Sequence, residues 1–339
     1  MSDSIRNIYN ETLFNQRLSK FVARQSLLLR PVLWVLVFCF FSFKTYGQVE
    51  VVEVKDINPG EASGIIFSSF NDAKVVGDLL YFKAIDGVHG EELWISDGTT
   101  EGTQLLKDIN PGNGTVSSNS FTPFNGLVFF QADDGVVGRE LWVTDGTEAG
   151  TELFLDINAG SGHGSPLYFT EFNGKLYFGA NNGTNGQELW VSDGTPSGTQ
   201  MVKDIRSGFS GSGPNYFTIL NNELFFRAND GVHGTELWKT DGTEAGTVMV
   251  KDIHEGDGGD PLHLTVFNGE LFFVVNDGIH GYELWKTDGT EAGTQLVKDS
   301  NPGPEGIVGA NFVSLPIPVV YNGKLYFASI NMEHLSYVL

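Results

Sequence analysis

Cysteine is almost absent from this sequence: Cys39 is the only one among 339 residues. A single thiol cannot form a disulfide within the chain, so the fold must be held together by its apolar core. Helical patterning is also lacking after residue 47, because no window shows apolar residues at a period of 3.6. With 43 glycines, the sequence indicates a globular β protein that is rich in turns.

Positive charge is scarce as well. Lys and Arg total 20 against 42 Asp and Glu, for a net charge of −22. Residues 1–47 hold six of the basic residues and two of the acidic ones, so the rest of the chain carries −26. A surface of this sign repels nucleic acid and anionic lipid, and we expect neither as a partner.

Catalytic and nucleotide-binding motifs are missing too. The sequence contains no GxxxxGK phosphate cradle, and no helix follows its glycine runs. No Gly-x-Ser-x-Gly elbow stands between a strand and a helix, and no thiol follows residue 47. We therefore expect no catalytic residues, no cofactor and no enzyme activity.

The only long apolar run is "PVLWVLVFCFFSF", residues 31–43, which follows a basic region and precedes small residues at Thr45 and Gly47. This order is typical of a signal peptide. Its 13 residues are fewer than the roughly 20 that span a bilayer. We expect a signal peptide over 1–47, a mature chain over 48–339 that does not insert into the membrane, and a protein that is secreted or at the cell surface, with the periplasm as an alternative.

The remaining sequence repeats itself. The tripeptide "ELW" recurs at spacings of 48, 48, 48 and 47 residues, beginning at Glu92, Glu140, Glu188, Glu236 and Glu283. A fixed period of this length is the signature of a repeated supersecondary unit. The chain therefore contains five full repeats and a partial sixth.

Each repeat reads as four short strands. In the third copy these are "LYFTEF", "KLYFGA", "QELWVSD" and "GTQMVKDI", and Asn173-Gly174 joins the first two. Asn-Gly favours a two-residue type I′ hairpin. Four-stranded units of this length predict the blades of a β-propeller.

The chain ends suggest a sixth blade. A lone strand at 49–57 precedes the first repeat, and "VSLPIPVVY" and "KLYFASIN" follow the fifth. Pairing them would cover both exposed sheet edges. We expect a monomeric propeller of six blades closed by strand 49–57, with an open β-repeat array as the alternative.

The motif residues are expected to build the fold. Period-two alternation places Glu188 and Trp190 on one face of their strand and Leu189 on the other, which favours stacking of Trp between blades and a turn-capping role for Glu. The alternatives are exposed aromatics that bind sugar rings, and acid–base catalysis by Glu. The repeated positions are Glu92, Leu93, Trp94, Asp97, Gly98, Glu140, Trp142, Asp145, Glu188, Trp190, Asp193, Glu236, Trp238, Asp241, Glu283, Trp285 and Asp288.

Five copies of "ELWxxDGT" in register, at 92–99, 140–147, 188–195, 236–243 and 283–290, make the chain similar to the ELWxxDGT repeat proteins. This resemblance covers about 50–330 and implies an exported bacterial protein of the hyalin-like type, without an assigned activity. The resemblance also implies that larger members tend to end in a sorting domain for secretion across the outer membrane.

Function is expected where the repeat varies, in the loops. Calcium is one hypothesis, with recurring loop carboxylates at Asp86, Asp134, Asp230 and Asp277, although Asp-Gly is also ordinary turn chemistry. A transition metal at "HEGDGGDPLH" is a weaker one. The candidate ligand-binding residues of the variable loops are Arg206, His254, Asp257, Asp260 and His263.

The sequence thus favours a non-catalytic interaction or adhesion module for an extracellular glycan or protein. One alternative is a polysaccharide-active enzyme on a propeller, for which the candidate residues are Arg206, Tyr168, Tyr216, His254 and Asp257. The other is a structural array stabilised by calcium.

Overall fold

The computed structural model describes residues 52–60, 64, 73–112, 114–116, 119–300, 302–304, 306, 318–327, 329–331 and 334–336. The predicted signal peptide at 1–47, Cys39 and residues 49–51 of the expected first strand lie outside this set. Residues 52–339 form one compact unit. Within the described part of the chain, none of the helical segments has the length and apolarity needed to cross a membrane.

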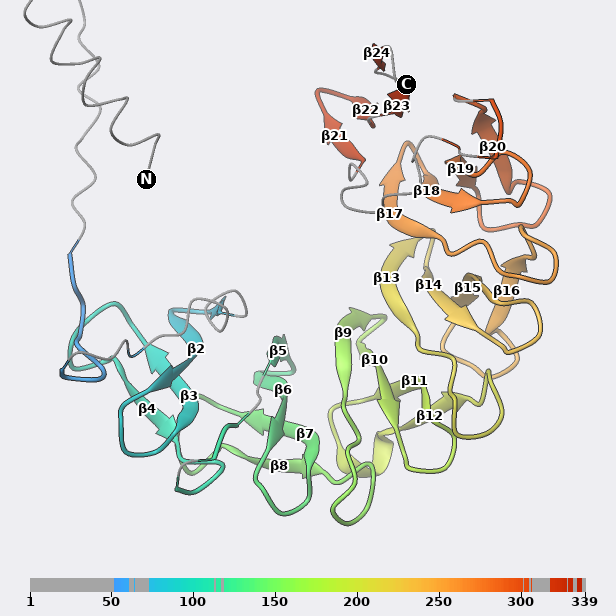
Figure 1. Cartoon of the computed structure of the whole chain (residues 1–339). Coiled ribbons are helices and arrows are strands. Elements are labelled where there is room, and N and C mark those ends of the chain that lie inside the picture. Colours follow the sequence, from blue (N-terminus) through green and yellow to red (C-terminus); the bar gives the residue numbers. More distant parts are fainter. Residues whose placement is uncertain are drawn as a thin grey trace, which may run out of the picture. The chain divides into compact units, whose positions relative to one another are not determined.

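Five antiparallel sheets of four strands follow one another along the chain, and each corresponds to one repeat (Figure 1). The strands of every sheet lie in sequence order. The five blades, numbered in chain order, consist of β1 (Lys74–Val76), β2 (Leu79–Ile85), β3 (Glu91–Ser96) and β4 (Gln104–Lys107); β5 (Asn119–Phe124), β6 (Leu127–Asp133), β7 (Arg139–Thr144) and β8 (Glu152–Leu155); β9 (Leu167–Phe172), β10 (Lys175–Asn181), β11 (Gln187–Ser192) and β12 (Gln200–Lys203); β13 (Asn215–Leu220), β14 (Glu223–Asn229), β15 (Thr235–Thr240) and β16 (Val248–Lys251); and β17 (Leu262–Phe267), β18 (Glu270–Asn276), β19 (Tyr282–Thr287) and β20 (Gln295–Lys298).

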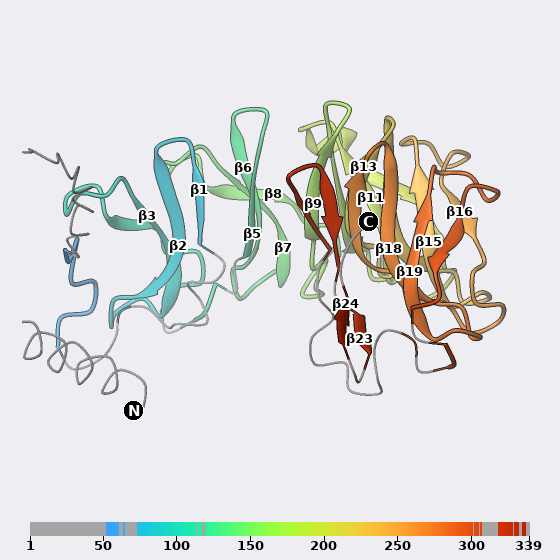
Figure 2. The same cartoon turned by 90° about the horizontal axis from the view of Figure 1, so that it is seen from above.

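The hairpin between the first two strands of a blade has the backbone that the sequence predicted. Asn173 and Gly174 both have positive φ, 50° and 68°, as a type I′ turn requires. In the fourth blade Asn221 and Asn222 adopt the same geometry, with φ of 48° and 62°. Two asparagines can therefore replace Asn-Gly here, because asparagine tolerates the left-handed region. Figure 2 shows these hairpins at one end of the sheets.

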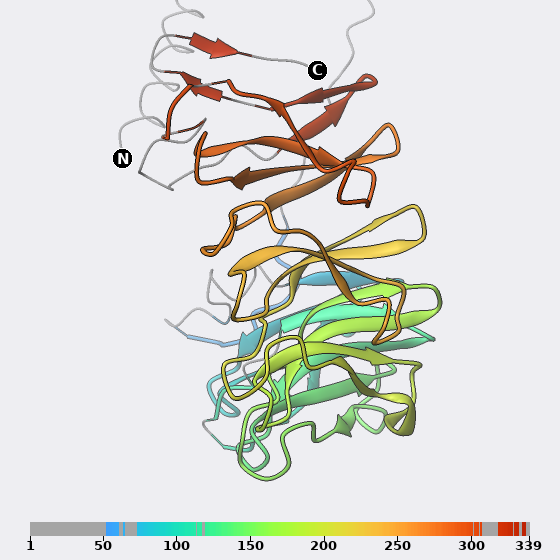
Figure 3. The same cartoon turned by 90° about the vertical axis from the view of Figure 1, so that its right-hand side faces the viewer.

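Neighbouring blades contact one another through their first strands, β5 with β9, β9 with β13 and β13 with β17. The blades pack face to face, as Figure 3 shows for the yellow sheet β13–β16 beside the orange sheet β17–β20. Consecutive four-stranded sheets that meet at their first strands are the arrangement of a propeller. The expected all-β propeller is confirmed.

The Leu and Trp of the ELW motif fill the two interfaces on either side of a blade. Leu189 belongs to a buried cluster shared with the fourth blade, which supplies Phe226 and Trp238. Trp190 belongs to the cluster shared with the second blade, where Leu141 lies. Each strand of this type is therefore covered on both faces, and the tryptophans are only 6–8% exposed.

The sixth repeat is represented by β21 (Val319–Tyr321) paired with β22 (Lys324–Tyr326), and by β23 (Ser329–Asn331) paired with β24 (His334–Ser336). Residues 52–57 are not assigned as a strand, so closure by strand 49–57 stays a prediction. Lys55 nevertheless donates from Nζ to the carbonyl oxygen of Thr103 at 2.6 Å.

This lysine contact recurs between neighbouring blades. Lys203 at the end of β12 donates to Thr247 O, and Lys251 at the end of β16 donates to Thr294 O, at 2.8 and 3.0 Å. Lys55 thus contacts the first blade in the way that a lysine at the end of a preceding fourth strand does.

Candidate functional site

The glutamate of the ELW motif is buried at the end of its blade. Glu188, with no exposed surface, accepts hydrogen bonds from the backbone N–H groups of Ile205 and Ser212 at 3.0 and 2.9 Å. It therefore fixes the loop that follows the fourth strand. Burial raises the pKa of three other copies to about 7, and the bonds from backbone amides oppose this rise; these copies are Glu92, Glu140 and Glu236.

The aspartate of the DGT segment holds the turn between the third and fourth strands. Asp193 Oδ1 accepts hydrogen bonds from the N–H and the hydroxyl of Thr195, at 2.9 and 2.7 Å. These bonds lower the pKa of Asp193. Its position is an Asx turn, which is a local role for the carboxylate.

The loop carboxylates that were candidates for calcium are already engaged. Asp230 Oδ1 accepts hydrogen bonds from the N–H groups of Val232 and His233 at 2.9 and 2.8 Å, and its Oδ2 lies 2.7 Å from His233 Nδ1. Asp86 and Asp277 make the same contacts with His89 and His280.

Two blades lack the histidine of this loop. Asp134 Oδ1 accepts from two backbone amides, and the position that corresponds to His233 is Val137. In the third blade it is Asn185, which donates to Asp204 Oδ2 at 2.8 Å. In the part of the chain that the structure describes, no group of three or more His, Cys, Asp and Glu is placed to hold a metal ion.

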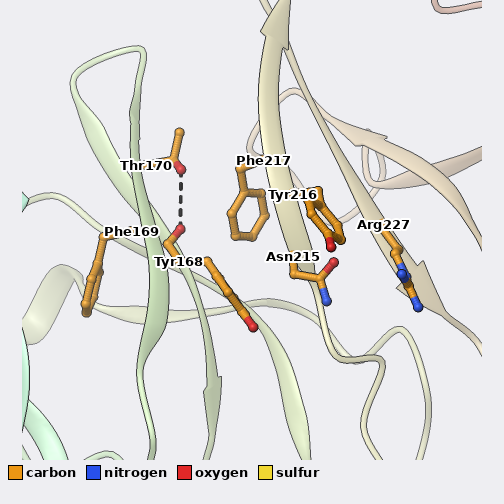
Figure 4. Close-up of a pocket in the computed structure, with 7 residues that line it drawn as sticks. All are labelled: Tyr168, Phe169, Thr170, Asn215, Tyr216, Phe217 and Arg227. Carbon is orange, nitrogen blue, oxygen red and sulfur yellow. Dashed lines mark hydrogen bonds between the residues drawn. The ribbon is translucent and has the colours of Figure 1, made fainter. Parts of the chain in front are cut away.

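A cavity lies between the first strands of the third and fourth blades (Figure 4). Its volume is about 450 Å³, which is in the range of small-molecule sites. Its residues come from β9, β13 and β14: Tyr168, Phe169, Thr170, Asn215, Tyr216, Phe217 and Arg227. None of the seven carries a carboxylate.

Two tyrosines supply exposed aromatic surface to this cavity. Tyr168 and Tyr216 are 49% and 45% exposed and occupy equivalent positions in β9 and β13. Both have positive φ, 64° and 58°, at a register shift in the first hairpin of each blade. A bulge of this kind redirects a side chain. A positive φ is uncommon for a residue as bulky as tyrosine.

A hydrogen bond follows each of these strained residues. The hydroxyl of Thr170 donates to the carbonyl oxygen of Tyr168, and that of Thr218 to the carbonyl oxygen of Tyr216, both at 3.3 Å. The first of these bonds is drawn in Figure 4. The threonines thus help to hold the backbone that directs the two tyrosines.

Polar groups lie beside the tyrosines. The guanidinium of Arg227 lies over the ring of Tyr216, 6.0 Å from its centroid. Its Nη2 atom donates to Asp260 Oδ1 at 2.8 Å. Asn215 is the cross-strand partner of Arg227, and its Oδ1 has no hydrogen-bond partner among the described residues. The cavity therefore combines aromatic surface with donors and acceptors.

The variable-loop candidates are not gathered in one place. The backbone N–H groups of Arg206 and His254 donate to the motif glutamates Glu188 and Glu236, at 3.0 and 3.2 Å. Asp257 is exposed in the same loop as His254. His263 is the second residue of β17, with φ of 57°, and burial lowers its pKa.

His254 lines a second cavity of about 560 Å³, together with Asp277 and Trp285. This cavity shares no lining residue with the one that holds Tyr168 and Tyr216. The five residues proposed for an enzyme are thus divided between different places. Of the variable-loop candidates, Asp260 alone is bonded to a residue of the aromatic cavity.

Arg227 and Asn215 were not identified from the sequence, although a signal was present. When the repeats are aligned on ELW, the second residue of the first strand reads Ser120, Tyr168, Tyr216 and His263 in blades two to five. The middle of the second strand varies as well, and an arginine stands there only in the fourth blade, as Arg227. Variation inside strands, and not only in loops, marked this site.

No family model and no curated protein matches the chain. Among solved structures it is similar to a puromycin hydrolase, with a TM-score of 0.46 and 14% identity over 76% of this chain and 41% of that chain. It is also similar to oligopeptidase B from Leishmania major, with a TM-score of 0.43 and 11% identity over 78% of this chain and 39% of that one. The chain spans about two fifths of the length of these peptidases, and at these scores the likeness carries no argument about activity.

Proposed function

We propose that this protein is a non-catalytic, exported member of the ELWxxDGT repeat proteins that binds an extracellular glycan in the aromatic cavity between its third and fourth blades. The observation that carries the proposal is the pair Tyr168 and Tyr216, half exposed in a cavity of about 450 Å³. Aromatic faces stack on the C–H surface of sugar rings, and the adjacent Arg227 and Asn215 supply groups for hydroxyls.

Binding is favoured over hydrolysis by the lining of the cavity. Glycosidic cleavage ordinarily uses a pair of carboxyl groups about 5 to 9.5 Å apart. The seven lining residues supply none, and Asp260 beside them is held by Arg227. The motif glutamates are enclosed by backbone amides, as Glu188 is.

A binding screen with product analysis tests the proposal. The purified protein is titrated with oligosaccharides and with peptides, and the solution is then examined for cleaved products. We expect binding to an oligosaccharide without turnover, and a loss of that binding in Tyr168→Ala and Tyr216→Ala. Tyr321→Ala is the matched control, because Tyr321 is 63% exposed but lies in β21, outside the cavity.

Three results would contradict the proposal. Release of shorter sugars would show an enzyme, binding of peptides alone would show a protein partner, and equal affinity in all three tyrosine variants would place the site elsewhere.

A further inference from the structure

We infer, on the basis of the proposed function, that the ligand of the aromatic cavity is a neutral glycan, and that Asp260 is the residue that discriminates against acidic ones. The aromatic surface of the cavity does not by itself select the charge of the ligand. It is carried by the contacts of Arg227, the only cationic residue that lines the cavity.

The positive charge of Arg227 is already matched. Its Nη2 atom lies 2.8 Å from Asp260 Oδ1, and its guanidinium also covers one face of the Tyr216 ring at 6.0 Å. An arginine that recognised an acidic sugar would instead offer its fork of N–H donors to the ligand's carboxylate. Here a carboxylate of the protein holds that place, so an acidic ligand would have to compete with Asp260.

Asp260 is itself placed by a constrained backbone. It stands two residues before β17, with φ of 50°, in the left-handed region that Asp and Asn accept more readily than most residues. Its carboxylate therefore reaches from the fifth blade to β14 of the fourth. The neutralising charge comes from a variable loop, whereas the arginine comes from a strand.

The remaining charge of the protein acts in the same direction. Residues 48–339 carry a net charge of −26, which repels polyanions at long range. The Debye length of about 10 Å at moderate salt leaves this effect significant only in dilute buffer. A cationic ligand is disfavoured locally, because the guanidinium lies in the lining and its partner carboxylate is occupied. A neutral ligand encounters neither penalty.

The groups that remain suit vicinal hydroxyls. A guanidinium has five N–H donors, of which one is used at Asp260 Oδ1. Asn215 is the cross-strand partner of Arg227; its Nδ2 donates to Gly213 O at 3.2 Å, and its buried Oδ1 is the acceptor that has no partner among the described residues. Tyr168, whose ring has no cation over it among the described contacts, supplies the stacking face. Together these groups can bind a ring through its apolar face and its edge.

Titration with two neutral hexasaccharides and one acidic hexasaccharide tests the inference. The probes are a glucose hexamer, a mannose hexamer and a galacturonic acid hexamer, each measured by calorimetry at low and at high salt over about a tenfold range of ionic strength. For the unsubstituted protein we expect binding of a neutral hexamer with an affinity that salt leaves unchanged, and binding of the uronic acid hexamer at least about tenfold weaker.

Asp260→Asn is the decisive variant. It keeps the size of the side chain and its tolerance of the left-handed backbone, but it leaves the charge of Arg227 unmatched. We expect the ratio of affinities to shift by about tenfold or more toward the galacturonic acid hexamer, with a steep decrease at high salt. Asp257→Asn is the matched control, since it removes the same charge from an exposed position of the same loop and should leave the ratio unchanged.

The outcomes separate the two claims. If no hexamer binds, the proposed function fails. If a hexamer binds but the uronic acid is preferred by the unsubstituted protein, or if Asp260→Asn and Asp257→Asn give the same ratio, glycan binding stands and the role of Asp260 is refuted. A melting curve of each variant shows whether a lost affinity reflects lost folding.

Discussion

The Nη2 atom of Arg227 lies 2.8 Å from Oδ1 of Asp260, and this contact joins the second strand of the fourth blade to the segment that leads into the fifth. The two side chains are 24% and 45% exposed, so water screens their attraction. Exposed ion pairs of this kind contribute about 0–1 kcal/mol to folding. The pair is therefore better suited to orienting a guanidinium than to holding two blades together.

The first prediction concerns the contribution of this pair to the stability of the fold. We expect Arg227→Met, Asp260→Asn and the double variant to unfold in denaturant within about 1 kcal/mol of the unsubstituted protein, with a coupling energy below about 1 kcal/mol. Chemical unfolding followed by tryptophan fluorescence measures this double-mutant cycle. A coupling above about 2 kcal/mol would mean that the pair is a structural clamp.

The second prediction concerns the buried glutamates. Glu188→Ala would leave the amides of Ile205 and Arg206 and the hydroxyl of Ser212 without this acceptor, whereas the Ser212 amide keeps the carbonyl oxygen of Gln187. We expect a loss of about 3 kcal/mol or more in the free energy of unfolding, and a smaller loss in Glu188→Gln, which keeps one acceptor oxygen. Glu171→Ala is the control, because Glu171 is exposed in β9. Equal losses in the two alanine variants would be contrary to this role.

The third prediction is a pH dependence of stability. Burial raises the pKa of Glu92, Glu140 and Glu236 in the folded protein from 4.5 to about 7. A carboxyl with a raised pKa favours the folded state while it is protonated. Its contribution is complete below about 4.5 and is lost as the pH rises to about 7.

We therefore expect the free energy of unfolding to fall between these pH values, by at most about 1.4 kcal/mol for each pKa unit of each group. Urea unfolding across the range, with the triple Gln variant for comparison, is the measurement. In that variant the slope should be flatter. An unchanged slope would show that other groups set the pH dependence.

The fourth prediction concerns the loop histidines. The hydrogen bond between His233 Nδ1 and the carboxylate of Asp230 raises the pKa of His233 above 6.5. The stabilisation is thus present below that pH and is lost as the pH rises through the folded-state pKa. We expect His233→Val to lower Tm slightly in acid and to leave it unchanged in alkali. Val137 occupies this position in the second blade, so the loop should accept valine; a large loss at every pH would argue for a packing role.

The fifth prediction concerns calcium. Asp86, Asp230 and Asp277 already bind two backbone amides and one histidine each. A cation would have to displace these partners. We expect Tm to be the same with a chelator and with added Ca²⁺, measured by calorimetry. An increase in Tm of several degrees with Ca²⁺ would instead support a structural array stabilised by calcium.

The repeat explains why so much of the fold was predictable. Asn173-Gly174 specified its turn through local backbone preference, and Leu189 and Trp190 specified coverage of both strand faces through period-two alternation. These are short-range properties. The ELW residues recur five times, and Asn-Gly recurs at 125–126, 173–174, 268–269 and 322–323. Closure of a sixth blade stays a prediction, because the strands expected to form it lie at opposite ends of the sequence and residues 52–57 are not assigned as a strand.

The candidate site was only half predictable. Tyr168 and Tyr216 were named as candidates for the enzyme alternative and Asp260 as a candidate of the ligand-binding loops, so the three were assigned to two different hypotheses. Arg227 was missed, because the middle of a β-strand is expected to pack and not to bind. Nothing in the spacing of residues 227 and 260 indicates that their side chains meet.

The sequence by itself determined the repeat, the blade, the hairpin turns and the burial of the motif residues, because each depends on neighbours within one copy or on identical interfaces between copies. The tertiary structure decided which differences between the copies meet to form a site. Only the packing of β9 against β13 brings Tyr168 beside Tyr216, and only the contact between the fourth and fifth blades sets Asp260 against Arg227. Such contacts join different repeats, and their distances depend on how whole blades pack.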